Sequence, residues 1–179
     1  RFTIMTDLAS AIQHVHSKGV IHRDLKPNNI GFDLQGTLKL FDFDVSRIIP
    51  KDAKARAAST GKAEDESYRL TQHVGTQRYM SPECAKGERY NCKSDVYAFG
   101  LVCHEIISLK VPYHHIRRSE DHFQKVFVQH ERPNLPWKWP KSLRHFLGSC
   151  WSQYFTNRPT MEKAYDFLSK ESDKIVASM

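Results

Sequence analysis

The sequence contains no run of apolar residues that approaches the roughly 20 needed for a membrane-spanning helix, so we expect no membrane segment. It also lacks a starting Met and a basic-then-apolar signal region, because Arg1 opens directly into a helical pattern. We therefore expect a fragment of a longer protein. With 40% hydrophobic and 26% charged residues, the 179-residue chain has the composition of one globular domain with a substantial core.

Cysteine is scarce and forms no C-x-x-C pair. The four cysteines are widely separated and fall mostly in helical patterns: Cys84, Cys92, Cys103 and Cys150. This pattern favours reduced core thiols over disulfides or zinc and indicates a reducing compartment, so we expect a cytoplasmic protein. The ten histidines contain no H-E-x-x-H spacing, and we interpret most of them as surface or satisfied core side chains.

Positive charge is abundant, with a formal net charge of +7, but no nucleic-acid-binding pattern accompanies it. The basic residues are scattered apart from two short clusters, and neither cluster has the interleaved aromatics of a base-stacking platform. We interpret the charge as a solvated surface and expect no nucleic-acid partner. The sequence does not indicate the oligomeric state.

Helical periodicity dominates the chain, which predicts an α+β fold that is mostly α-helical. Apolar residues recur at helical spacing over 2–17, 94–108, about 119–128, about 141–151 and about 161–170. The segment 94–108 is apolar on nearly all sides, so we expect it at the centre of the domain. Two short apolar runs, 30–32 and 37–40, are separated by Asp-Leu-Gln-Gly and predict a β-hairpin.

Two polar stretches flank this hairpin. Residues 22–29 read HRDLKPNN, and Pro27 makes this stretch a loop; Asp42 and Asp44 follow the second strand. The hairpin therefore places acidic and amide groups side by side. Carboxylate and amide oxygens suit Mg²⁺, and a lysine ammonium suits a phosphate.

These stretches resemble the motifs of eukaryotic-type protein kinases, in the same order along the chain. Residues 22–29 fit H-R-D-L-x-x-x-N, and 42–44 nearly match D-F-G; 81–83 read S-P-E for A-P-E, 95–100 fit D-V-x-x-F-G, and C-W…R-P follows at 150–159. Lys26-Pro27 and Gly75-Thr76 resemble serine/threonine-directed members, and the later motifs lean toward the tyrosine-kinase-like group.

The resemblance implies a protein-kinase-like fold of which residues 1–179 form the carboxy-terminal lobe, without the amino-terminal lobe. A short hairpin would carry the catalytic and metal loops. Residues 42–83 would form the activation segment, and 50–66, which lack any bulky apolar residue, predict a mobile insertion. ATP and Mg²⁺ would be the cofactors, and a protein would be the substrate.

By the same resemblance, Asp24 would accept or orient the proton of the substrate hydroxyl and Lys26 would neutralise the moving phosphoryl group. Asn29 would hold one Mg²⁺, and Asp42 would bridge Mg²⁺ to the nucleotide phosphates. Gly31 occupies the position that usually forms the floor of the adenine pocket, so a glycine there predicts looser nucleotide packing.

Other residues would support this site. His22 and Phe43 would pack and align it, Asp95 would hold the catalytic loop, and Thr76 would contact Asp24 and Lys26. Glu83 and Arg158 would form a buried ion pair.

Arg23 would pair with a phosphorylated residue of the activation segment, for which Thr71 is preferred over Ser67 and Tyr68. The alternative, to which we give equal weight, is that these are ordinary loop hydroxyls.

The leading hypothesis is a serine/threonine protein kinase that transfers the γ-phosphate of ATP to protein hydroxyls. The alternative is a pseudokinase or scaffold with the same fold that binds protein partners without phosphoryl transfer. Three features favour this alternative: Asp44 stands where the family has a glycine, Gly31 replaces a large apolar residue, and the sequence lacks a glycine-rich loop and a strand lysine. Without that loop and lysine, the fragment itself is expected to be inactive. Aspartate is among the few side chains that tolerate the left-handed conformation, so the loop can still form with Asp44, while an additional acid near the metals and less conformational freedom would weaken or retune activity. A small-molecule phosphotransferase is disfavoured by the full activation segment.

Overall fold

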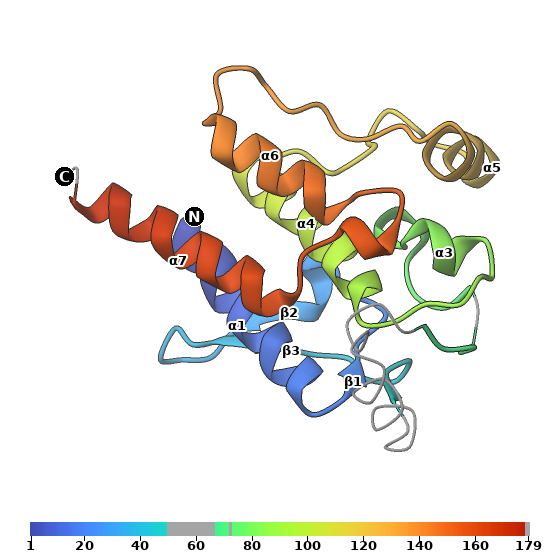
Figure 1. The fold of residues 1–179 in the computed structure, drawn as a ribbon, viewed down its shortest axis with the longest axis horizontal. Coiled ribbons are helices and arrows are strands. Elements are labelled where there is room, and N and C mark those ends of the chain that lie inside the picture. Colours follow the sequence, from blue (N-terminus) through green and yellow to red (C-terminus); the bar gives the residue numbers. More distant parts are fainter. Residues whose placement is uncertain (50–66, 72, 178–179) are drawn as a thin grey trace.

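The computed structural model describes residues 1–49, 67–71 and 73–177, and the insertion predicted at 50–66 lies outside the described residues. Helix α4 (Lys93–Ser108) is the central element, with every residue from 93 to 104 buried. It contacts α1 (Phe2–Ser17) and α6 (Lys141–Cys150), and Figure 1 shows α6 running alongside it. The prediction of a central buried helix is confirmed.

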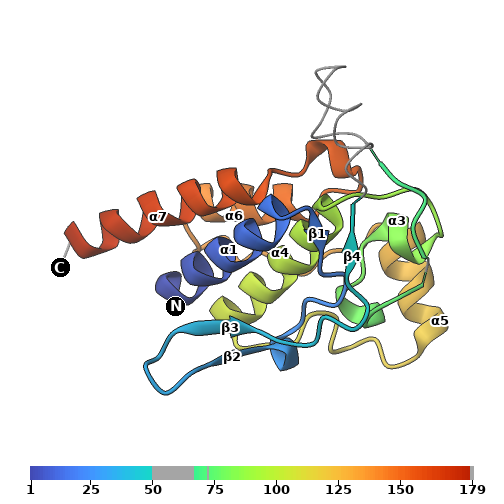
Figure 2. The same ribbon diagram turned by 90° about the horizontal axis from the view of Figure 1, so that it is seen from below.

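Helix α1 buries one face and leaves the other to solvent. Its apolar residues Met5, Leu8 and Ile12 recur at helical spacing and are buried, and Gly19 follows the helix with a φ of +75°. The last helix, α7 (Met161–Ala177), packs across α1 (Figures 1 and 2). The first and last helices therefore close the same side of the core.

The predicted hairpin is present. Strand β2 (Ile30–Phe32) pairs antiparallel with β3 (Leu38–Leu40), with Ile30 opposite Leu40. Asp33 holds the turn, because its Oδ1 accepts hydrogen bonds from the backbone N–H groups of Gln35 (3.0 Å) and Thr37 (2.8 Å). Figure 2 shows the hairpin below α1, which β3 contacts.

A second strand pair was not predicted. Strand β1 (Val20–Ile21), directly after α1, pairs antiparallel with β4 (Arg47–Ile48). Two-residue strands carry too little alternation to be recognised in a sequence. The pair joins the segment that enters residues 22–29, the predicted catalytic stretch, to the segment that leaves residues 42–44, so the two polar stretches lie between paired strands.

The later helices differ from their predicted bounds. The helix expected at 119–128 is a short α-helix, α5 (Ser119–His122), continued by a π-helical segment, η3 (Phe123–Val128). Helix α7 continues to Ala177 instead of ending near 170, because no helix breaker follows and Lys174 pairs with Glu171 at 2.7 Å.

Four short elements complete the described chain, and the mostly helical architecture with small antiparallel pairs confirms the predicted fold class. They are the 3₁₀ turns η1 (Pro27–Asn29), η2 (Gln77–Tyr79) and η4 (Phe155–Asn157), and the helix α3 (Pro82–Ala85).

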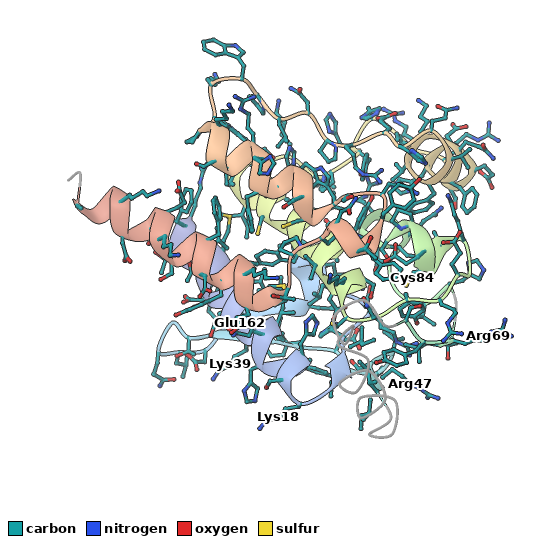
Figure 3. All side chains as sticks on the ribbon, in the orientation of Figure 1. Lys18, Lys39, Arg47, Arg69, Cys84 and Glu162 are labelled. Carbon is teal, nitrogen blue, oxygen red and sulfur yellow. The ribbon has the colours of Figure 1, made fainter. Side chains whose placement is uncertain are left out.

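The thiols of Cys84, Cys103 and Cys150 are buried and free, as predicted, whereas Cys92 is only partly buried; Cys84 can be located on α3 in Figure 3. Burial, followed by the negative charge of Glu83, raises the pKa of Cys84 to about 12, so this thiol stays protonated at neutral pH. Among the helices that the structure describes, none is long and apolar enough to cross a bilayer.

Candidate active site

A side chain in the first turn of α4 binds the backbone of the predicted catalytic stretch. Asp95, 1% exposed, accepts hydrogen bonds from the backbone N–H groups of His22 (2.8 Å) and Arg23 (2.9 Å). Its Oδ2 also lies 2.8 Å from Nε2 of His16 at the end of α1. Arg23 has a φ of +71°, an uncommon conformation for a non-glycine residue, and the bonds to Asp95 hold the two peptide N–H groups that lead into it.

Asp95 is stable as a buried carboxylate because its partners outweigh its burial. Burial raises the pKa of Asp95. The hydrogen bond and charge of His16, together with the two backbone N–H donors, lower it by more than burial raises it, so the pKa lies below its ordinary value. His16 is a site residue that sequence reasoning missed, since it lies 79 positions before its partner and no local pattern marks it.

Asp24 is the centre of a convergent set of donors. Its Oδ2 accepts from Nζ of Lys26 (2.7 Å) and from Nδ2 of Asn29 (3.2 Å), and its Oδ1 accepts from the backbone N–H of Thr76 (2.7 Å). Lys26 also donates to Oγ1 of Thr76 at 3.0 Å. The structure thus brings together four of the predicted site residues from two segments of the chain.

The charge on Asp24 is stabilised by these neighbours. Burial raises its pKa, but the hydrogen bonds from Lys26 and Thr76 and the charge of Lys26 exceed that effect, so the pKa of Asp24 is lowered. Asp24 is therefore an ionised carboxylate at neutral pH, with a lysine ammonium beside it.

The hairpin register places the backbone of Asn29 beside that of Phe41, the residue directly before Asp42. Ile30 pairs with Leu40, and one step further the N–H of Phe41 donates to the carbonyl of Asn29 at 2.9 Å. Asp42 follows Phe41, is exposed, and has a φ of +59°. Among the described residues its carboxylate forms no hydrogen bond or ion pair, which leaves both oxygens open to a ligand.

This arrangement suits a magnesium ion bound together with phosphates. Mg²⁺ is commonly held by one or two carboxylates, with water and substrate phosphates completing its shell, and one amide and one open carboxylate provide such a partial set. No cluster of three or more His, Cys, Asp or Glu side chains that could hold a metal exists within the described ranges.

The left-handed residue in the 42–44 stretch is Asp42. The sequence indicated only that Asp44 tolerates this conformation in place of glycine, and Asp44 does not adopt it but lies in a turn. The N–H of Ser46 donates to the carbonyl of Phe43 at 2.9 Å and closes this turn, in which aspartate is a favourable residue. The missing glycine therefore requires no strained conformation here.

His22 and Phe43 pack against each other, with ring centroids 4.7 Å apart. Nε2 of His22 also lies 3.0 Å from the carbonyl oxygen of Phe41. His22 is completely buried, and no metal ligand set surrounds it among the described residues. The contacts are those of a packing residue that joins the two polar stretches.

The predicted activation segment approaches residues 22–29 at a glycine. Gly75 has a φ of +93°, and a Cβ atom at this position would collide with the carbonyl oxygen of Arg23 and lie 3.3 Å from Oδ1 of Asp24. Only glycine fits both the conformation and the space. The close approach is what allows the next residue, Thr76, to reach Asp24.

Arg23 extends toward Thr71 and Tyr90. Its guanidinium donates to the hydroxyl of Tyr90 (3.0 Å), to the carbonyl of Thr71 (3.4 Å) and to the carbonyl of Val45, and the Tyr90 hydroxyl donates to the same Thr71 carbonyl at 2.7 Å. Thr71 is exposed, whereas Ser67 and Tyr68 lie earlier in the segment, where Tyr68 forms a β-bridge with Tyr90. Tyr90 was not singled out by the sequence.

The predicted ion pair between Glu83 and Arg158 is present and buried. Nη1 and Nη2 of Arg158 donate to Oε1 (2.6 Å) and Oε2 (2.8 Å) of Glu83 in a bidentate arrangement. Arg158 also donates to the carbonyl of Lys93 at 3.0 Å and lies 5.1 Å from the centre of the Tyr97 ring. The pair links the end of the activation segment to α4 and to the segment before α7.

Comparison with known proteins agrees with these motifs. The family model described as "Protein kinase domain" matches residues 2–167. The chain is 35% identical over 175 residues to a probable LIM domain-containing serine/threonine-protein kinase of Dictyostelium discoideum, covering 98% of this chain and 24% of that protein. It is 32% identical over 170 residues to a dual specificity protein kinase of the same organism, covering 94% and 31%.

A plant relative gives the same result. The chain is 31% identical over 164 residues to a serine/threonine/tyrosine-protein kinase of Arabidopsis thaliana, covering 92% of this chain and 38% of that protein. The chain thus spans less than two fifths of the length of each of these relatives. Since the family model covers nearly the whole sequence, the chain belongs to the protein kinase family.

Proposed function

We propose that this chain carries the catalytic loop of a serine/threonine protein kinase that uses ATP and Mg²⁺. The observation that carries the proposal is the set of contacts around Asp24, whose carboxylate lies within hydrogen-bonding distance of Lys26, Asn29 and Thr76. Phosphoryl transfer depends mainly on positioning and on charge that complements the phosphate oxygens, and this cluster supplies both.

Each residue has a role that its surroundings support. Asp24, held ionised, accepts a hydrogen bond from the substrate hydroxyl and takes its proton as the hydroxyl oxygen bonds to the γ-phosphorus of ATP, while the bond from that phosphorus to the bridging oxygen breaks and ADP leaves. Lys26 lies beside it and offsets negative charge on the transferring group. Asn29 and Asp42 hold Mg²⁺, which when bound neutralises charge on the nucleotide phosphates. Thr76, 3.0 Å from Nζ of Lys26, fixes the direction of that ammonium.

The substrate is proposed to be a protein serine or threonine. Lys26 and Thr76 form the combination that resembles serine/threonine-directed kinases, and the names of the relatives include serine/threonine specificity. An open hollow of about 240 Å³ beside Gly75 is lined by Met80, Phe123 and Phe127, which suits the apolar part of a peptide.

Phosphate transfer from Mg²⁺-ATP to serine, threonine and tyrosine peptides tests this proposal in the full-length protein. Asp24→Asn removes the proton acceptor at nearly constant shape and is expected to lower transfer at least about a hundredfold. Asp166→Asn, the same change on the exposed side of α7, is the matched control and is expected to leave transfer unchanged. Wild-type transfer no higher than that of Asp24→Asn, with nucleotide still bound, would refute the proposal and leave a pseudokinase.

We also propose that phosphorylation of Thr71 regulates this site. Arg23 already reaches the Thr71 carbonyl, so a phosphate on the adjacent side chain would bring two negative charges within range of this guanidinium. Phosphopeptide mapping of active protein is expected to find phosphate at Thr71, and Thr71→Ala is expected to lower activity, whereas Ser67→Ala is not. Full activity of protein without phosphate at Thr71 contradicts this proposal.

A further inference from the structure

A large cavity lies at the end of α4 that is opposite the catalytic stretch. It has a volume of about 560 Å³, and its walls are the last turns of α4, the segment 110–115 before α5 and the segment 131–139 between η3 and α6. In Figure 1 the second of these segments belongs to the long loop that returns to α6. Helix α4 has 16 residues and rises about 1.5 Å for each, so its two ends are roughly 20 Å apart. The cavity is therefore separate from the candidate active site.

The walls of the cavity are fixed by contacts between the elements that form them. His104 of α4 is buried, its ring centroid lies 5.6 Å from that of Trp139, and its Nε2 lies 3.1 Å from the carbonyl oxygen of Asn134. The hydroxyl of Tyr113 donates to the carbonyl of Glu131 at 3.4 Å, which joins the two loop segments. The cavity is thus formed before a ligand binds, as is usual for binding sites in proteins.

Positive charge exceeds negative charge around this cavity. Among the described residues that line it, three are permanent cations, Lys110, Arg132 and Lys138, and one is an acid, Glu131. The carboxylate of Glu131 already lies 2.8 Å from Nε2 of His115. Arg132 donates to backbone carbonyls and to one amide oxygen, and in the described part of the chain neither lysine has an ion-pair partner. These cations are therefore open to an acidic ligand.

The mouth of the cavity is surrounded by exposed apolar side chains. Val111 lines the cavity and is exposed, while Leu109 and Trp137, each next in sequence to a lining residue, are 72% and 85% exposed. Single exposed apolar residues are common, but several gathered beside a cavity mark an interaction site, and tryptophan often anchors such sites. The apolar surface extends beyond the cavity itself, which favours a ligand larger than a small molecule.

We propose that this cavity is a docking site for an acidic peptide segment of a partner protein. One large apolar side chain of the peptide enters the cavity, and acidic residues on either side of it pair with Lys110 and Lys138. The volume lies within the range of about 300–1,000 Å³ that is typical of ligand sites. A lipid surface would contact the exposed rim but leave the cavity empty, so the concave shape favours a peptide over a membrane. This inference goes beyond the proposed phosphate transfer and does not depend on it.

The test is the affinity of the full-length protein for three fluorescein-labelled peptides, measured by fluorescence anisotropy without nucleotide. Each peptide has three glutamates on either side of a central phenylalanine, tryptophan or leucine. Lys110→Glu/Lys138→Glu is expected to weaken binding at least about tenfold, because attraction becomes repulsion. Lys18→Glu/Lys170→Glu is the matched control, since both lysines are exposed outside the cavity, and Lys18 is labelled in Figure 3; its affinity is expected to stay within about twofold of wild type.

Two further variants test the apolar part of the site. Val111→Trp places a larger side chain at the mouth and is expected to weaken binding about tenfold, because the anchor of the peptide can no longer enter. Trp137→Ala is expected to weaken it about fivefold, whereas Tyr154→Ala, which removes an exposed aromatic residue that does not line the cavity, leaves the affinity unchanged. Thermal unfolding of each variant identifies any loss of affinity that comes from loss of the fold.

The peptides provide their own controls. Alanine in place of the central apolar residue is expected to weaken binding about tenfold or more, and lysines in place of the glutamates are expected to abolish it. Absence of binding by all three peptides, or an equal loss of affinity in the two lysine double variants, overturns the proposal. Wild-type protein that binds vesicles containing phosphatidylserine but none of the peptides overturns it in favour of a membrane surface.

Discussion

His122 is a buried histidine that has no hydrogen-bond partner among the described residues. It should make the stability of the domain sensitive to mild acid. Its ring lies between those of Tyr113 and Phe127, with centroids 5.2 Å and 5.3 Å away, and neither ring nitrogen has a partner in the described part of the chain. Burial, assisted by the positive charge of Arg78 and opposed by Glu131, lowers the pKa of His122 from 6.5 to about 4.

The sign and size of the effect follow from this shift. Between pH 6.5 and about 4, the unfolded chain binds a proton at position 122 and the folded chain does not, so acid favours unfolding. The contribution is fully present above the unfolded pKa and is lost as the pH falls toward the folded one. At 1.36 kcal/mol for each unit of pKa, the free energy of unfolding should fall by up to about 3 kcal/mol over this interval.

Urea unfolding of wild type and His122→Phe at several pH values from 7.5 to 4.5 measures this effect. Phenylalanine keeps the aromatic contacts and cannot titrate, so the variant should lose less stability on acidification, and the difference between the two curves isolates His122. His145→Phe, which removes an exposed histidine of α6, controls for the loss of an imidazole. Parallel curves for wild type and His122→Phe across this range would refute the reasoning.

Three further predictions follow from contacts in the site. Glu83→Ala leaves a buried guanidinium without its carboxylate and should lower the free energy of unfolding in urea by about 3–5 kcal/mol. Lys174→Ala, which breaks an exposed pair, should lower it by less than about 1 kcal/mol, and equal losses in the two variants would contradict this account. Gly75→Ala forces a Cβ against the carbonyl oxygen of Arg23 and should lower kcat/KM for phosphate transfer about tenfold or more; unaltered transfer would show that the close approach is unnecessary. Asp95→Asn replaces one acceptor oxygen by a donor and should speed hydrogen exchange of the two catalytic-loop amides at least about tenfold, an effect that unchanged protection would disprove.

Local patterns were sufficient to predict most of the regular structure. The helices of α1 and α4 and the hairpin were expected at nearly their observed bounds, because periodicity and turn residues act within a few positions. The strands β1 and β4 were missed, since each has only two residues. The helix at 119–128 was predicted as uniform, but a hydrophobic pattern alone does not distinguish an α-helical turn from a π-helical one.

Motif order located the site residues and some of their partners, but not all of them. Asp24, Lys26 and Asn29 share one loop and were expected together, whereas His16 reaches Asp95 only through the packing of α1 on α4. Likewise, Gly31 predicted looser nucleotide packing, because the sequence does not reveal that the ring of Phe41, which follows the opposite strand, lies against this glycine. Contacts between distant segments depend on the tertiary fold, which a local pattern does not contain.

The hairpin register has a consequence for how this region tolerates changes in length. Residues inserted at the turn around Asp33 would lengthen the exposed loop and leave the pairing of Ile30 with Leu40 intact. A single residue inserted within β3 would move each following side chain of the strand to the opposite face of the hairpin. Phe41 would then point into the core, and Asp42 would shift relative to Asn29. Insertions and deletions among relatives should therefore accumulate at the tip of the hairpin and be absent from its base.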